Sequence, residues 1–367
     1  MRRVFRWLAT QVYLTLHRPF LRRHLTHFSQ ILKEPKRIIL RLPTAPGELL
    51  FAIPTLQVIR KVYRDSRIFL LVSEERKILL QGNHHFDGIT LDDHRTLPFT
   101  PTFFRWKRHL RRQGFDLFID LCPKNGNRGR LISLLSGAKV RIGRDEGEPF
   151  YNCEIYGEEA HRDEVEKHLF LVSTFLPDSG NRVEGIPFFL FQKRTRVVRD
   201  FLRFQGVKEG EILVGVDLHQ WDRSFLLRLL RSLEELYSPR ILLLGSLDTL
   251  PPKGLRARIG RGHQARMEEI HECLKKVPIH IPSHLKLECP EMVKECHLFL
   301  SFKTDFFSIA YALEVPTILF LRQSEVGSFR PPTKETFKPI ILGKKGDFPL
   351  KEVLKKVKEL LGMEDDK

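Results

Sequence analysis

The chain has 367 residues, of which 42% are hydrophobic and 29% are charged, and its formal net charge is +17. This balance is typical of a globular protein of about two domains, and no short repeat or low-complexity tract interrupts it. The five cysteines form neither a CxxC motif nor a Cys/His cluster with zinc spacing. We therefore expect reduced thiols rather than a disulfide framework.

Residues 1–35 are predicted to form a basic amphipathic segment. Residues 1–37 hold seven Arg and two Lys against one Glu, and the longest uncharged stretch, Trp7 to Leu16, has only ten residues. That is too short to span a bilayer, and no small-x-small cleavage site follows, so we predict neither a transmembrane helix nor an export signal. Two interpretations stay open. The segment lies on an anionic membrane surface, which implies a cytoplasmic protein peripheral on the inner face of the cytoplasmic membrane, or it packs as a basic arm on the first domain.

The next stretch predicts a βαβ unit. A short aliphatic run at 38–40 is typical of a buried parallel strand, and the prolines and glycine of 41–47 end it. A helix is expected to begin at Glu48 and to run through Pro54 to Tyr63, before a second strand at 67–72. The polar turn then lies at the carboxyl end of the first strand, where open α/β sheets bind their ligands.

Strands and helices alternate twice along the chain, which predicts two α/β domains with parallel sheets covered on both faces. The expected boundaries are 36–190 for the N-terminal domain, 191–210 for a linker, 211–345 for the C-terminal domain and 346–367 for a closing helix and tail. The predicted strands lie at 38–40, 67–72, 88–91, 117–120, 140–142, 212–216, 241–244, 278–281, 298–301 and 317–321. The predicted helices lie at 48–63, 74–81, 103–113, 128–136, 168–176, 194–204, 224–237, 267–276, 289–296, 306–313 and 350–361.

Several segments resemble one family in order and spacing. Besides the βαβ unit they are GNHHFDGI (82–89), FDLFIDL (115–121), LLSGAKVRIGRD (134–145), ILLLGSLD (241–248) and the stretch 295–321. Together they are similar to glycosyltransferase family 9, the lipopolysaccharide heptosyltransferases, over roughly residues 36–340. The resemblance implies an α/β fold of two Rossmann-like doubly wound domains facing a cleft (GT-B). It also implies an acceptor domain first, a nucleotide-sugar domain second, and no metal or other cofactor beyond the nucleotide sugar.

Glu48 is the candidate catalytic base. It follows Gly47 at the expected start of a helix, in the positive end of the helix dipole. The resemblance places it where the family carries an Asp that accepts the proton of the acceptor hydroxyl, and a Glu can fill the same role. The alternative is an acid that only complements a helix N-terminus. The resemblance further implies an anionic glycolipid or glycan acceptor, for which the expected binding residues of the basic first domain are Thr44, Gly47, Lys124, Arg128 and Arg141.

The donor site is expected after the strand at 298–301. The family pattern of Asp-Thr-Gly followed by His falls on Lys303, Thr304, Asp305 and Ser308, so that only Thr304 is kept. A strand–turn–helix joint of this kind can hold a diphosphate on helix amides, or it can be a joint without a ligand. Arg223 is the nearest cation to the place of the family's Lys-x-Trp-Pro, and Gly245 lies where the family contacts the nucleoside.

Two functions from different classes follow. The first is an inverting glycosyltransferase that moves a heptose-like sugar from a nucleotide-diphosphate donor to a lipopolysaccharide-core or related glycan acceptor. The alternative is a catalytically inactive GT-B protein that binds or scaffolds in envelope-glycan assembly, which the altered donor motif supports. Nucleic acid is a third possible partner for the positive charge, but the chain shows no RRM, KH, zinc-finger or helix-turn-helix signature.

Overall fold

The computed structural model describes most of the chain, and all that follows concerns these parts. They are residues 2–18, 28–44, 47–92, 97–122, 126–144, 150–155, 162–176, 185–186, 188–245, 269–282, 285, 288–326, 329, 335–343 and 349–363. Lys124, the start of the predicted helix at 267–276 and the tail from 364 onward lie outside them. The chain divides into two compact units, Met1–Pro187 and Phe188–Lys367.

The first unit is built on a six-stranded sheet in which every recorded strand pair is parallel. Its order is β3-β2-β1-β4-β5-β6, so the direction of winding reverses between β1 and β4. Ile38, Ile39 and Leu40 of β1 are completely buried, as the aliphatic run predicted. The strands are β1 (Arg37–Arg41), β2 (Arg67–Val72), β3 (Gly88–Leu91), β4 (Leu117–Asp120), β5 (Val140–Gly143) and β6 (Cys153–Glu154).

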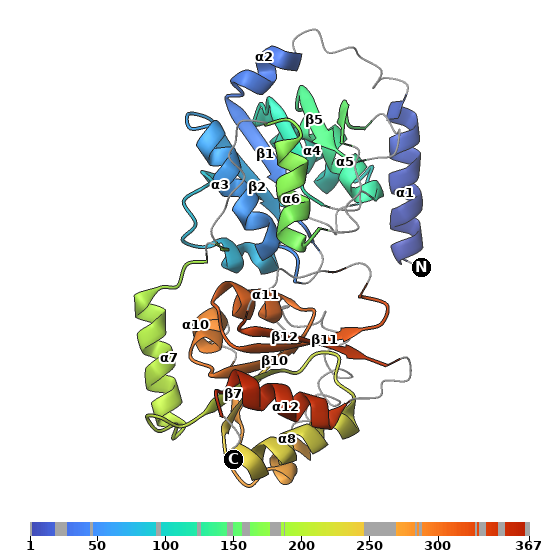
Figure 1. Cartoon of the computed structure of the whole chain (residues 1–367). Helices are drawn as coiled ribbons and strands as arrows, with labels where there is room; N and C mark the ends of the chain where they lie inside the picture. Colours follow the sequence, from blue (N-terminus) through green and yellow to red (C-terminus); the bar gives the residue numbers. More distant parts are fainter. Residues whose placement is uncertain are drawn as a thin grey trace. The chain divides into compact units, whose positions relative to one another are not determined.

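Helices flank this sheet (Figure 1). They are α1 (Arg2–His17), α2 (Phe28–Lys33), α3 (Ile53–Val62), α4 (Pro101–Arg112), α5 (Asn127–Ser136) and α6 (Glu164–Ser173). The predicted helix at 48–63 is regular only from Ile53, after a 3-10 turn at Leu50–Ala52. The reason is Pro54, which has no N–H to donate to the carbonyl of residue 50 and is tolerated only in a first turn. The segment Glu74–Leu80, predicted as an α-helix, is also 3-10.

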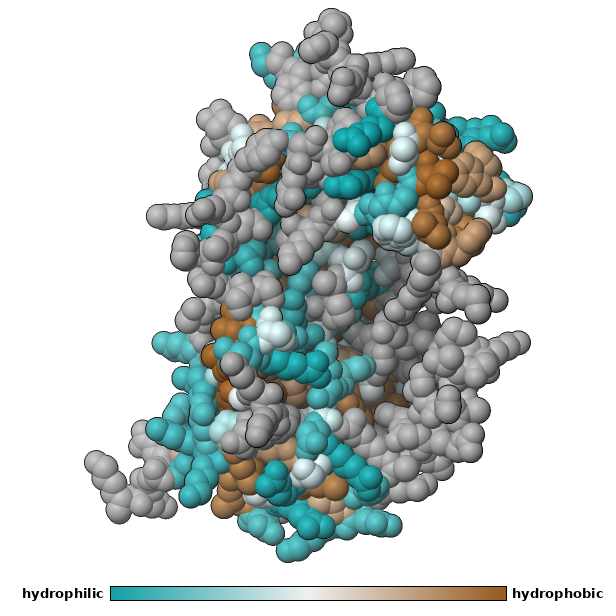
Figure 2. Space-filling model, turned by 90° about the vertical axis from the view of Figure 1, so that its right-hand side faces the viewer, coloured by the Kyte–Doolittle hydropathy of each residue, from teal (hydrophilic) through white to brown (hydrophobic). Residues whose placement is uncertain are grey.

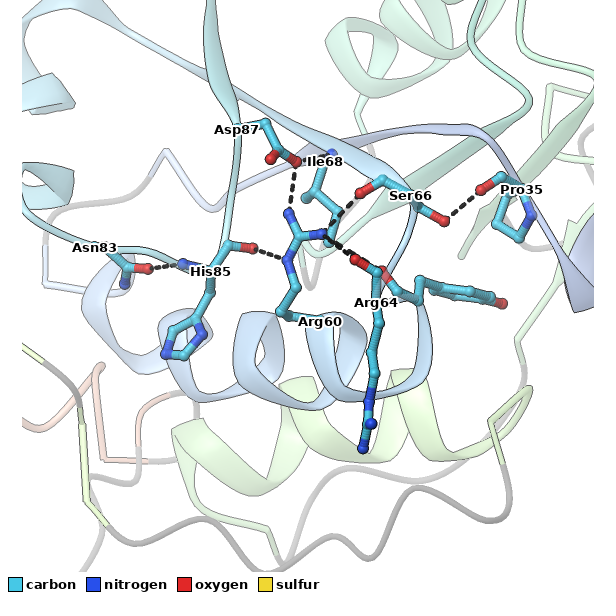
Figure 3. Close-up of polar contacts among 9 residues, drawn as sticks. Pro35, Arg60, Arg64, Ser66, Ile68, Asn83, His85 and Asp87 are labelled. Atoms are coloured by element: carbon cyan, nitrogen blue, oxygen red, sulfur yellow. Dashed lines mark hydrogen bonds and ion pairs between the residues drawn. The ribbon is translucent and has the colours of Figure 1, made fainter.

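The C-terminal end of α3 is fixed by one arginine (Figure 3). Arg60 forms an ion pair with Asp87 at 2.6 Å and donates to the carbonyl of Ser66 at 2.7 Å. The same Asp87 carboxylate accepts from the backbone N–H of Ile68 in β2 at 2.7 Å. The helix that follows Glu48 is therefore tied at its far end to the loops flanking β2.

The second unit repeats the topology of the first. Its sheet has the order β12-β11-β10-β7-β8-β9, again with parallel pairing, and its winding reverses between β7 and β10. The strands are β7 (Leu213–Asp217), β8 (Arg240–Leu244), β9 (Ile279–His280), β10 (Leu298–Phe302), β11 (Thr317–Arg322) and β12 (Phe337–Leu342). The sequence did not predict β12, because Pro339 lies inside it, and proline is accepted only in an edge strand such as this.

The helices of the second unit lie on both faces of its sheet (Figure 1). They include α7 (Gln192–Phe204), α8 (Arg223–Tyr237), α10 (Cys289–Lys294), α11 (Asp305–Ala312) and α12 (Leu350–Leu360). Leu229 of α8 and Val353 of α12 share one buried core with the strands. The stretch 191–210, expected as a linker, holds α7, which packs on α10 and pairs Arg199 with Glu295 at 2.9 Å. Among the described residues no helix is both long and apolar enough to cross a bilayer.

Candidate active site

Glu48 lies on the turn after β1, close to the point where the first sheet reverses its winding. Gly47 has φ +74°, a left-handed conformation that glycine adopts without strain, and it brings the chain from β1 into the helical segment. The Glu48 side chain is half-buried. Burial raises the pKa of the Cys122 thiol, which follows β4; Asp120 and Glu48 raise that pKa further, whereas Arg41 lowers it. Glu48 is therefore within electrostatic reach of Cys122, which follows the end of β4.

A buried ion pair joins those two strand ends. Nη1 of Arg41, the last residue of β1, lies 2.9 Å and 3.1 Å from the two carboxylate oxygens of Asp120, the last residue of β4. The Tyr151 hydroxyl donates to Asp120 Oδ2 at 2.6 Å, and the Cys122 backbone N–H donates to Oδ1 at 3.0 Å. Burial alone would lower the pKa of Arg41, but the negative charge of Asp120 and its neighbours raises it. The pair is therefore ionised, because each buried charge is stabilised by its oppositely charged partner.

Two glycines make room for this pair. A Cβ atom on Gly129 of α5 would lie 2.8 Å from the Tyr151 hydroxyl and 2.9 Å from both Arg41 Nη1 and Asp120 Oδ2. A Cβ atom on Gly143 of β5 would overlap the Tyr151 ring. The backbone of α5 thus passes directly against the ion pair.

The predicted acceptor residues lie in different surroundings. Arg128 of α5 forms an ion pair with Asp92, which follows β3, and its guanidinium lies 5.0 Å from the centre of the Trp106 ring. The negative charge of Asp92 also raises the pKa of Arg41, so Arg128 belongs to the same charged neighbourhood. Arg141 instead donates to the backbone carbonyls of Phe150 and Ala138 at 3.1 Å each.

Thr44 is exposed, and its carbonyl accepts from Arg76 of the 3-10 helix Glu74–Leu80. Gly47 is buried. Sequence reasoning did not single out the polar residues that surround this turn, namely Arg41, Asp92, Asp120 and Tyr151. A signal was present for two of them, because Asp120 ends a predicted strand and Arg41 directly follows the predicted run at 38–40.

The second unit has a corresponding cluster at its own reversal point. Asp217, the last residue of β7, is completely buried, and its Oδ2 accepts from Thr304 Oγ1 at 2.5 Å and from Ser301 Oγ at 3.0 Å. Its Oδ1 lies 2.5 Å from Nδ1 of His219 and accepts from the His219 backbone N–H at 3.1 Å. Ser301 lies in β10 and Thr304 caps α11, so the carboxylate links the two strands on either side of the reversal.

The structure places four of the six predicted donor residues together, on the turn between β10 and α11 and in the first turn of that helix. Thr304 also accepts from the backbone N–H of Phe307 at 3.4 Å, which makes it the N-cap of α11, and Asp305 is the first residue of that helix. The Lys303 ammonium lies 4.4 Å from the centre of the Phe329 ring. Ser308 is completely buried, and its hydroxyl donates to the Asp305 carbonyl at 2.8 Å.

The other two predicted donor residues follow neighbouring strands. Arg223 is the first residue of α8, where its largely exposed side chain forms an ion pair with Glu269. Gly245 follows β8, and a Cβ atom there would meet no other atom within 4 Å. Because β10, β7 and β8 are parallel neighbours, their carboxyl ends lie on one edge of the sheet. Sequence reasoning missed Asp217, His219 and Ser301. Within the described residues, no three His, Cys, Asp or Glu side chains converge as a metal site would require.

Comparison with known proteins relates this architecture to one group of enzymes. No family model matches the sequence, and no curated protein does. Among solved structures, a glycosyl transferase family 9 protein from Veillonella parvula superposes with a TM-score of 0.71 at 14% identity, over 90% of this chain and 99% of its own. The ADP-heptose LPS heptosyltransferase II of E. coli gives a TM-score of 0.67 at 14% identity, over 89% of this chain and 98% of its own.

A third structure carries a ligand. E. coli heptosyltransferase WaaC with ADP-2-deoxy-2-fluoro heptose gives a TM-score of 0.61 at 15% identity, over 88% of this chain and 99% of its own. These matches span both units of the present chain. They confirm the fold that the sequence predicted: the chain has the GT-B fold of the family 9 heptosyltransferases.

Proposed function

We propose that the protein is a glycosyltransferase that moves a heptose-like sugar from a nucleotide-diphosphate donor to an anionic glycolipid of the lipopolysaccharide-core kind or a related glycan, with inversion. The observation that carries this proposal is the position of Glu48. It lies on the turn after β1, beside the winding reversal of the first sheet, in a chain that shares its fold with heptosyltransferases. Ligands of open α/β sheets bind outside such reversals.

In this proposal Glu48 accepts the proton of the acceptor hydroxyl. The acceptor oxygen then forms its bond to the anomeric carbon of the sugar, while the bond from that carbon to the diphosphate oxygen breaks and the nucleotide diphosphate leaves. The buried pair of Arg41 and Asp120 would act as a positioning element, because it fixes the strand end from which the Glu48 turn departs. Arg128 would attract the anionic acceptor.

The leaving diphosphate would be held at the start of α11. The first amides of a helix attract anions, and Lys303 adds a positive charge directly before the Thr304 cap. Asp305 works against this charge, since it places a carboxylate in the first turn. A glycolipid acceptor would place the reaction at the inner face of the cytoplasmic membrane.

The test of this function is a Glu48→Gln variant. The variant should keep the melting temperature of the wild type and should release no nucleotide diphosphate from ADP-heptose in the presence of a lipopolysaccharide-core acceptor. Glu74→Gln is the matched control, because Glu74 is exposed and begins the neighbouring 3-10 helix. Full turnover by Glu48→Gln would rule out its role as the base.

A non-catalytic binding or scaffolding role is the second candidate, and the donor turn favours it. The Thr304 hydroxyl is bonded to Asp217, the Ser308 hydroxyl is bonded within its helix, and Asp305 opposes a phosphate. Thermal shift with nucleotide diphosphates and nucleotide sugars separates the two functions. A saturable ligand raises the melting temperature by mass action, whereas a protein without a donor site responds to none of them.

A further inference from the structure

Helix α1 carries a row of exposed apolar side chains. Phe5, Leu8, Val12 and Leu16, here called the apolar stripe, are 64%, 48%, 51% and 58% exposed. Their spacing of three and four residues places them on one face of the helix. Figure 2 views the molecule from the side that carries α1, and apolar side chains gather there on the first unit. A continuous apolar row of this kind on a surface marks an interaction site.

The opposite side of α1 is firmly packed. Tyr13 and Leu14 are buried in the core of the first unit, and the Tyr13 ring meets Phe103 of α4 edge-on at 5.0 Å. The Lys107 ammonium of α4 donates to the Tyr13 hydroxyl at 2.9 Å. The helix is therefore held in place on the first unit with the apolar stripe turned outward.

The positive charge of α4, which packs on α1, indicates what covers the stripe. Helix α1 contains three arginines and no acidic residue. Helix α4 contains four arginines and one lysine, again without an acidic residue. A second copy of this chain would bring two such cationic helices together across a twofold axis, which their charges oppose. An anionic lipid surface offers both an apolar phase for the stripe and negative charge for the arginines.

We propose that α1 lies in the headgroup region of an anionic bilayer, with the apolar stripe inserted between the lipids. The inference does not rest on the proposed glycosyl transfer, and Glu48→Gln should bind membranes as the wild type does.

The test is co-sedimentation of the full chain with vesicles of phosphatidylglycerol and phosphatidylethanolamine, with phosphatidylcholine vesicles for comparison. The wild type should bind the anionic vesicles, and salt should weaken the binding. The double variant Leu8→Glu, Val12→Glu should bind the anionic vesicles at least about tenfold more weakly than the wild type, because it places two carboxylates at the acyl boundary. Leu8→Gln, Val12→Gln should weaken binding in the same direction without changing the charge.

The matched control is Val197→Glu, Leu236→Glu, which makes the same chemical change at side chains that are 41% and 58% exposed in the second unit. It should bind vesicles as the wild type does, and all variants should keep the wild-type melting temperature. Equal binding by the stripe variants, or equal binding of the wild type to phosphatidylcholine, would overturn the proposal. So would a wild-type dimer in sedimentation velocity that Leu8→Gln, Val12→Gln converts to a monomer, since the stripe would then be a protein interface.

Discussion

The hydroxyl of Thr304 lies 2.5 Å from the buried carboxylate of Asp217, and this contact ties the cap of α11 to the end of β7. The first unit has an analogous link, in which Arg41 at the end of β1 binds Asp120 at the end of β4. In both units a completely buried carboxylate thus joins the two strands at which the winding reverses. We infer that these carboxylates fix the geometry of the turns to which ligands of this fold class bind.

Replacing Asp217 with Asn should loosen the donor turn. The amide would turn an N–H group toward the hydroxyls of Thr304 and Ser301, so that buried donors lose their charged acceptor. The free energy of unfolding should fall by about 1–3 kcal/mol, as urea denaturation would measure. Asp200→Asn on α7 is the control, because that carboxylate is 74% exposed and lies 3.6 Å from its partner Arg203. An equal, small effect of both substitutions would contradict a structural role for Asp217.

Adding one methyl group at Gly129 should strain the buried ion pair of Arg41 and Asp120. The new Cβ would lie 2.8 Å from the Tyr151 hydroxyl and 2.9 Å from the ion pair, so Gly129→Ala should destabilise the protein by about 1–3 kcal/mol. Gly126→Ala is a close control, since it precedes the same helix and its Cβ would meet no atom within 4 Å. If thermal unfolding showed the two variants to be equally stable, the close approach of α5 to the ion pair would be refuted.

The sequence predicted the strands well because a buried parallel strand leaves a local pattern. Ile38 to Leu40 is such a run, and β1 formed there with all three side chains buried. Two of the failures of local patterns involved a proline. Pro54 moved the start of α3 to Ile53, and Pro339 concealed the edge strand β12.

The site was harder to predict than the fold, because its contacts join residues far apart in the chain. Asp217 and Thr304 are separated by 87 positions, and Arg41 and Asp120 by 79. Neither pair forms a motif, and only the strand order brings its members together. Glu48 and Thr304 could be named because a family resemblance, rather than a periodicity, pointed to them.

Removing the charge of Asp305 should strengthen nucleotide binding. In the proposed donor site its carboxylate repels a diphosphate bound at the start of α11. Asp305→Asn should therefore bind ADP at least about threefold more tightly than the wild type. The same change should lower stability by about 0.3–1 kcal/mol, since an acid in the first turn favours the helix dipole. Lys303→Gln is the opposite change and should weaken ADP binding in the same calorimetric titration. If neither substitution changed the affinity for ADP, the diphosphate would have to bind elsewhere.

His168 should make the protein less stable in mild acid. Its ring is buried on α6, and burial, with help from the charges of Arg144 and Lys167, lowers its pKa to about 3. The unfolded chain takes up a proton at this residue near pH 6.5, whereas the folded protein does not. Stability from this group is therefore complete above pH 6.5 and falls, by about 1.4 kcal/mol for each pH unit, as the pH drops toward 3.

A His168→Gln variant isolates this contribution, because glutamine does not titrate. Urea unfolding at pH 8 gives the baseline cost of the substitution, since the imidazole is neutral there in both the folded and the unfolded chain. Between pH 6 and pH 5 the wild type should lose about 1 kcal/mol more than the variant. Parallel curves for the two proteins over that interval would mean that the imidazole gains its proton in the folded state, and that the surroundings of α6 admit a charge.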